Sequence, residues 1–267
     1  MYGGEEPGVA RRAADALLEL LAPSVCLACG GLGGGRLGLC PVCRGALKRL
    51  RPPLCRGCAR PVDPRLVSPR GRCRSCRGRR SPLAAVVAVW SYEPPLDAVV
   101  HALKYRRLEA LGAELAREIA HLASLPAVDW VAPVPLHWLR RLIRGYDQAE
   151  AIAAPLAGWL GLPWRRALVR RRATPPLARL GLDRARRMAR LRGAFRPRRR
   201  VPIAGRSVLL VDDVLTTGAT LAAAAAALRR AGAARVVGLA AGRTPEPAGA
   251  APPVRLLHPG GDGTRFF

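Results

Sequence analysis

The sequence predicts an α/β fold in which helices flank a parallel sheet, preceded by a separate cysteine-rich module. Two observations support this prediction. After Pro82, short apolar runs alternate with helix-length segments, and one run, Val208 to Val211, fits a strand buried on both faces. Before Pro82, every cysteine belongs to a C-x-x-C pair. We therefore expect an N-terminal tail and helix (1–25), a cysteine-rich module (26–80), an α/β domain (81–245) and a flexible tail (246–267).

The composition limits the class of partner. Against 18 Asp and Glu, the 267 residues carry 45 Lys and Arg, nearly all of them arginine, for a formal net charge of +27. Such a surface attracts polyanions such as nucleic acid, nucleotides and diphosphates. The longest apolar runs are too short to span a membrane. No secretory signal is recognisable, so we expect a cytoplasmic protein with no membrane span.

The cysteines follow the spacing C-x2-C-x10-C-x2-C-x11-C-x2-C-x14-C-x2-C. Without an export signal, this pattern indicates metal ligands rather than disulfides. Each C-x-x-C turn aims two thiolates at one tetrahedral ion, so the four turns predict two closed, structural zinc sites. Sequential pairing is preferred to a crossed pairing of alternate turns, and to an iron–sulfur cluster. The expected ligands are Cys26, Cys29, Cys40 and Cys43 in one site, and Cys55, Cys58, Cys73 and Cys76 in the other.

The expected elements follow in chain order. Before the cysteines, an amphipathic pattern predicts a helix over Ala13–Leu21. Apolar runs predict strands over Leu83–Trp90, Asp129–Val134, Val208–Val211 and Val236–Ala241, and one near Leu168. Helical patterns cover Leu96–Tyr105, Leu108–Leu122 and Leu221–Arg230.

Lys104 lies at the end of the first of these domain helices and is one of only two lysines in the chain. Either a compact ammonium is needed there for binding, or Lys104 is a solvated cation at a helix end.

A cationic cluster follows the second strand, in PVPLHWLRRLIRGYDQA. Pro133 and Pro135 stiffen the turn beyond the strand end, where open α/β sheets place their ligands. The cluster suits a diphosphate, although a solvated basic turn would have the same composition. His137 either belongs to this cluster, caps a helix or serves as a packing residue. Gly145 and Tyr146 are expected to open the next helix. The candidate anion-binding residues are Arg140, Arg141 and Arg144.

The segment Arg165–Arg200 contains fifteen arginines and a single acid, Asp183. In an enzyme it would be a lid that closes on a charged substrate and excludes water. On a binding protein it would be a patch that follows a phosphate backbone. Few aromatic residues are available for stacking, so sequence-specific recognition of single strands is poorly supported.

The stretch VLLVDDVLTTGAT organises the domain. Asp212 and Asp213 stand where the strand is expected to end, and carboxylates there can accept hydrogen bonds from the vicinal hydroxyls of a sugar. A small, hydroxyl-rich turn then enters a helix N-terminus, whose free N–H groups and dipole attract phosphate. The stretch therefore predicts a ribose-phosphate site. The residues expected to hold the phosphate are Thr216, Thr217, Gly218, Ala219 and Thr220.

A Walker B strand would look similar, but it requires a G-x-x-x-x-G-K-[ST] loop. Neither lysine of this chain follows a glycine, so that reading fails. The stretch instead resembles the motif with which type I phosphoribosyltransferases bind phosphoribosyl diphosphate (PRPP).

The whole order of motifs resembles the ComF family of bacterial competence proteins. The resemblance runs from about Cys26 to Arg243 and includes the zinc ribbon, the LKY segment, the PVPLH…RGYDQA stretch, the TP…GAF segment and VDDVLTTGAT. It implies a type I phosphoribosyltransferase fold, PRPP binding with Mg2+, and a cytoplasmic role in handling single-stranded DNA during natural transformation. Three positions depart from the family pattern: Asp147 replaces the usual Asn, Leu177 a common Gln, and Arg190 a common Asn.

Two classes of function fit this resemblance. As an enzyme, the chain would use Asp212 and Asp213 for the ribose, the Thr216–Thr220 turn for the 5′-phosphate, and Arg140, Arg141, Lys104 and Mg2+ for the departing diphosphate. No acceptor pocket is identifiable in the sequence. As a scaffold, the chain would contact DNA, an uptake helicase or a recombination mediator, with PRPP as a regulator or relic.

Overall fold

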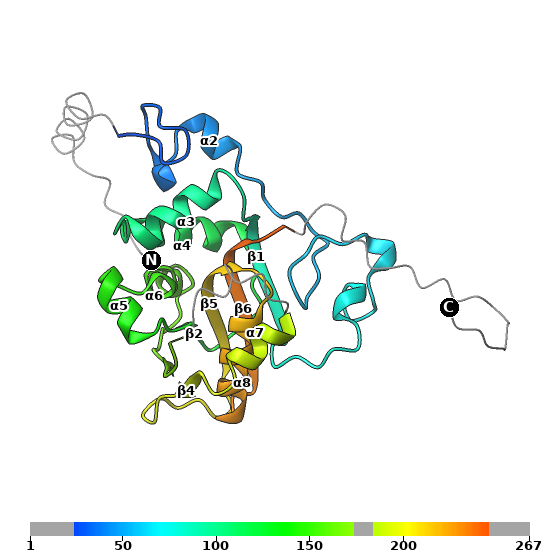
Figure 1. Cartoon of the computed structure of the whole chain (residues 1–267). Helices are drawn as coiled ribbons and strands as arrows, with labels where there is room; N and C mark the ends of the chain where they lie inside the picture. Colours follow the sequence, from blue (N-terminus) through cyan, green and yellow to red (C-terminus); the bar gives the residue numbers. More distant parts are fainter. Residues whose placement is uncertain (1–23, 174–183, 246–267) are drawn as a thin grey trace, which may run out of the picture.

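The computed structural model describes residues 24–173 and 184–245. The expected helix Ala13–Leu21 and the tail from residue 246 lie outside them. The centre of the fold is a parallel sheet with strand order β1-β6-β5-β2 (Figure 1). Its strands are β1 (Ala85–Ser91), β6 (Arg235–Arg243), β5 (Ser207–Leu215) and β2 (Trp130–Pro133).

Both faces of the sheet are covered, as the apolar strand predicted. On one face Leu209 and Val211 of β5 pack with three helices: α3 (Leu96–Tyr105), α4 (Ala110–Leu122) and α6 (Gln148–Trp159). On the other face Val208 and Leu210 pack against α8 (Ala219–Arg230). Each such side chain contributes roughly 1.5–3 kcal/mol by leaving water.

A small antiparallel unit lies on the α8 face. It pairs β3 (Leu168–Arg170) with β4 (Phe195–Pro197), and α7 (Arg184–Arg190) precedes β4 in the chain. Phe195 and Leu168 are buried in the same core as α8. The segment Arg165–Arg200 is thus partly built into the domain, and residues 174–183 lie outside the described part of the chain.

The structure corrects three expectations. The strand of the motif does not end before the acids, because β5 continues to Leu215 with Asp212 opposite Ala240 of β6. A helix missing from the sequence analysis, α5 (Trp138–Arg144), follows β2. Gly145 therefore ends a helix rather than opening one: it is the C-cap of α5 with φ of 87°, a conformation that favours glycine.

The cysteine module has two parts. The first ribbon (residues 26–43) contains a 3-10 turn, Arg36–Gly38, and helix α2 (Pro41–Gly45) begins within it. The second ribbon (residues 55–76) contains 3-10 turns at Pro64–Leu66 and Arg74–Cys76. Figure 1 shows them on different sides of the sheet domain.

The ribbons are joined to the α/β domain by specific contacts. Leu37 of the first ribbon is buried in the core of α3, α4 and α6, and its N–H donates to the Glu114 carboxylate. The segment between the ribbons runs beside the edge strand β1, where the N–H of Leu50 donates to the Val89 carbonyl at 2.8 Å. This pairing covers a strand edge that would otherwise be open.

Candidate functional site

The two acids of the motif project from adjacent positions of β5 and so belong to opposite faces of the sheet. Asp213 faces the α3 side, where its Oδ2 lies 2.8 Å from Nζ of Lys104. The Asp213 side chain is 7% exposed and that of Lys104 is 19% exposed, so this ion pair is largely buried. Lys104, which the sequence predicts among the diphosphate residues, contacts Asp213 in this structure.

Asp212 is an acid whose ionisation the surroundings disfavour. Burial and the neighbouring Asp213 carboxylate raise the pKa of Asp212 to about 8, even though part of the residue still reaches solvent. Lys104 and Arg170 act in the opposite direction without cancelling the effect. A negative charge on both acids is therefore costly in the free protein, and a cation or hydroxyl donors at this point would relieve the cost.

The turn after β5 has the features of an anion cradle. Gly218 is the N-cap of α8 with φ of 71°, and the helix follows at once. The N–H of Ala219 donates weakly to Oγ1 of Thr217 at 3.4 Å. Arg187, from α7, donates from Nη1 to Oγ1 of Thr216 at 3.0 Å. A threonine-lined helix N-terminus with an arginine beside it suits a phosphate group.

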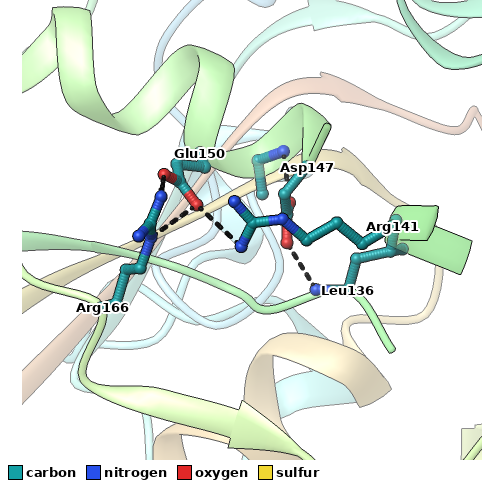
Figure 2. Close-up of polar contacts among 6 residues, drawn as sticks. Leu136, Arg141, Asp147, Glu150 and Arg166 are labelled. Atoms are coloured by element: carbon teal, nitrogen blue, oxygen red, sulfur yellow. Dashed lines mark hydrogen bonds and ion pairs between the residues drawn. The ribbon is translucent and has the colours of Figure 1, made fainter. Parts of the chain in front are cut away.

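The arginines after β2 are held in different ways, so they do not form one uniform cluster. Arg141 forms an ion pair with Glu150 at 3.7 Å, and Glu150 also binds Arg166 (Figure 2). Arg144 donates to Oε1 of Gln148 at 2.7 Å and its guanidinium lies 5.0 Å from the centre of the Tyr105 ring. Burial and Arg144 lower the pKa of Arg140, although a guanidinium remains charged.

His137 and Asp147 shape this loop. His137 is the N-cap of α5, with Nδ1 accepting from the N–H of Leu139 at 3.4 Å. Asp147 caps α6 through Oδ1, which accepts from Ala149 at 3.0 Å, while Oδ2 accepts from the N–H of Leu136 at 2.6 Å (Figure 2). Burial raises the pKa of Asp147, against the effect of these hydrogen bonds. The carboxylate thus fastens the loop after β2 to α6.

Two site residues were not singled out in the sequence. Arg187 touches the cradle, as described above. Arg170 of β3 lies 5.4 Å from the centre of the Phe195 ring, and its pKa is lowered by burial and Arg140 while Asp212 acts to raise it. Both belong to a segment so rich in arginine that nothing local distinguishes them. Of the positions that depart from the family pattern, Arg190 is exposed on α7, and Leu177 lies outside the described residues.

The cysteines gather in the two sets of the sequential pairing rather than the crossed one. In each set the four Sγ atoms lie within 4.8 Å of one another. The Sγ atoms of Cys29 and Cys40 are 3.9 Å apart, as are those of Cys58 and Cys73. Four sulfurs placed ~2.3 Å from a tetrahedral zinc would be roughly 3.8 Å apart. The donor set and spacing therefore fit structural zinc, with no position open for catalysis.

Comparison with known proteins agrees with this architecture. Residues 17–82 match the double zinc ribbon domain, and residues 182–247 match the phosphoribosyl transferase domain. DNA utilization protein YhgH of Salmonella typhi is 35% identical over 226 residues, which cover 81% of this chain and 96% of that protein. Competence protein F of Haemophilus influenzae is 29% identical over 214 residues, covering 72% of this chain and 91% of that protein. The chain belongs to the ComF family.

The fold is that of the family: a double zinc ribbon followed by a phosphoribosyltransferase domain with a parallel sheet flanked by helices. The two cysteine clusters are its structural zinc sites. Glutamine PRPP amidotransferase from B. subtilis, in complex with ADP and GMP, shares 23% identity over 52% of this chain and 26% of that chain, with a TM-score of 0.31. That likeness is too low to add to the family assignment. In the described part of this ComF-family chain, every helix is too short or too polar to cross a membrane.

Proposed function

We propose that this ComF-family protein binds PRPP with Mg2+ at the ends of β5 and β2. The observation that supports it is the sequence of groups along β5: two acids in the last part of the strand, then a threonine-rich turn and the N-terminus of α8. Because β2 is the neighbour of β5 in the sheet, its arginine-bearing loop begins beside the acids. Ribose, 5′-phosphate and diphosphate thus each have a suitable partner within one edge of the sheet.

The roles follow from the chemistry of each group. Asp212 and Asp213 accept hydrogen bonds from the 2′- and 3′-hydroxyls, with Lys104 holding Asp213 in place. The turn Thr216–Thr220 holds the 5′-phosphate with help from Arg187. The candidates for the diphosphate are Arg140, Arg141 and Arg144, which lie on the helix that follows β2.

Mg2+, which prefers oxygen ligands, would neutralise the diphosphate and offset the cost of negative charge on both acids. We further propose transfer of the phosphoribosyl group to an acceptor. As the diphosphate departs, positive charge develops on the ribose carbon, and the carboxylates of Asp212 and Asp213 would stabilise it.

The biological role we propose is in DNA uptake during natural transformation, from the names of the relatives: DNA utilization protein and competence protein. A second candidate is a nucleic-acid-binding scaffold in which PRPP regulates or is a relic. The exposed arginines beside β4 favour it, since a run of them can follow a phosphate backbone: Arg196, Arg198, Arg199 and Arg200. This role would allow contacts with single-stranded DNA, a helicase or a recombination mediator.

Calorimetric titration of PRPP with Mg2+, with and without a short single-stranded DNA, tests these proposals. We expect micromolar PRPP affinity that shifts when the DNA is present. The double variant Asp212→Ala with Asp213→Ala should lose PRPP binding and keep its zinc, because neither acid belongs to a cysteine cluster. If the wild-type protein binds DNA but not PRPP, the proposal of an enzyme is refuted and the proposal of a scaffold remains.

A further inference from the structure

A cavity of about 580 Å³ lies between the second ribbon and the phosphate cradle. One wall is the second ribbon, with Gly57, Cys58 and Cys76. The opposite wall is the end of β5 and the turn after it, from Leu215 to Gly218. The cavity is far larger than the single phosphate group that the turn can hold, and its volume is typical of sites for small organic ligands.

The strand order places this cavity on a defined side of the PRPP site. In the order β1-β6-β5-β2, the diphosphate arginines follow β2, on one side of β5. The cavity is lined instead by Tyr92, which follows β1, and by Arg243 and Thr244 at the end of β6, on the other side of β5. Figure 1 shows α5 and the second ribbon at opposite edges of the sheet. A second ligand in the cavity would approach the ribose from the side away from the diphosphate.

The chemistry of the lining selects for an anion. Arginines come from three parts of the chain: Arg60 and Arg79 from the ribbon module, Arg187 from α7 and Arg243 from β6. None of the described residues that line the cavity is acidic. Charge-assisted hydrogen bonds from arginine are the usual means of holding phosphate or carboxylate.

Arg243 and its neighbour Thr244 form the part of the cavity wall at the end of β6. Arg243 is only 7% exposed, and among the described residues its Nε has no hydrogen-bond partner. The hydroxyl of Thr244 is buried without a partner as well. The Nη1 of Arg243 donates to the carbonyl of Thr244 at 2.6 Å, so the guanidinium is held in place at the cavity wall.

Apolar side chains complete the lining. Leu83, Val86 and Leu215 contribute carbon surface, and Tyr92 adds an aromatic ring. A flat ring can pack there while its anionic group reaches the arginines.

We propose that this cavity binds a nucleoside phosphate next to PRPP, with the second zinc ribbon forming one wall of the site. The proposal rests on the PRPP site proposed above and adds its second ligand. The ribbon thereby contributes directly to ligand binding besides its structural role. The nucleoside phosphate is either a free mononucleotide or the terminal nucleotide of a DNA strand, since both present the same ring and phosphate.

The test is calorimetric titration into the full-length, zinc-loaded protein saturated with PRPP and Mg2+. The probes are thymidine monophosphate and a short single-stranded oligonucleotide with or without a terminal phosphate. We expect Arg79→Gln to weaken binding of the favoured probe roughly ten-fold or more, because it removes a charged donor. The matched control is Arg74→Gln, an exposed arginine of the same cysteine-rich module that does not line the cavity, and it should change affinity less than two-fold.

Ser75→Trp is the second variant, since it fills the ribbon wall without changing the charge and should also weaken the probe. The proposal would be overturned if the Arg79→Gln and Ser75→Trp variants bound the probe as tightly as the wild-type protein does. It would also be overturned if no probe bound a protein that does bind PRPP. If PRPP itself does not bind, the proposed function fails first, and the two failures are therefore distinguished.

Discussion

Replacing Lys104 with methionine should destabilise the protein much more than replacing Lys48 in the same way. These are the only two lysines of the chain, and each pairs with one acid: Lys104 with Asp213 at 2.8 Å, and Lys48 with Glu93. Methionine keeps most of the side-chain volume and removes the charge. The pair of variants therefore compares a buried and an exposed ion pair within one protein.

The magnitudes follow from burial. Burial alone would lower the pKa of Lys104, but the charge and hydrogen bond of Asp213 outweigh it and raise the pKa. Removing one partner of a buried pair costs about 3–5 kcal/mol, and the residual exposure of Lys104 places the expected loss near ~3 kcal/mol. Lys48 is 71% exposed, and Glu93 keeps a hydrogen bond from Ser91 at 2.9 Å. Replacing Lys48 with methionine should therefore lower the free energy of unfolding by at most about 1 kcal/mol.

Thermal unfolding of the two variants at pH 7 measures the difference. A loss of ~3 kcal/mol in a chain of this size lowers Tm by roughly 6–12 °C. Adding Asp213→Asn to Lys104→Met should restore part of the loss, because the carboxylate is no longer left charged and unpaired. Equal Tm values for Lys104→Met and Lys48→Met would refute the reasoning that Asp213 depends on Lys104.

Two other predictions concern the same edge of the sheet. Asp212→Asn should weaken PRPP binding yet stabilise the free protein above about pH 4: the raised pKa means that wild-type stability is complete below the ordinary aspartate pKa and falls as the pH rises through about 8. Unfolding by urea from pH 4 to 9 checks this, and a wild-type stability that rises over that range would contradict it. Asp147→Ala should cost roughly 1–3 kcal/mol and weaken PRPP binding, because it removes the cap of α6 and the anchor of Leu136. The Tm and PRPP affinity of Asp147→Asn should lie between those of the wild-type protein and Asp147→Ala. An alanine variant as stable as the wild-type protein would show that the anchor is dispensable.

Much of the site is local in sequence and could be predicted. The strand of the motif, its two acids and the following turn are consecutive, and the helix N-terminus follows from a glycine with positive φ at Gly218. The C-x-x-C turns are local too, and their grouping follows from the order of the ribbons. Helix α3 has the predicted limits, Leu96–Tyr105, because its apolar spacing is regular. Helix α5 was missed because its outward side chains, such as Leu142 and Ile143, are exposed and break the amphipathic pattern.

The remaining features depend on contacts between distant parts of the chain. Nothing near Lys104 in sequence indicates Asp213 as its partner, and only the packing of α3 on the sheet brings them to 2.8 Å. Nothing in the sequence distinguishes Arg187 and Arg243 from the many other arginines, and only the tertiary structure brings them to one cavity. The sequence by itself determined the chemistry of the edge of the sheet, because those groups are neighbours along one strand. The tertiary structure alone decided that the second ribbon faces that edge, because this depends on pairing between segments far apart in the chain.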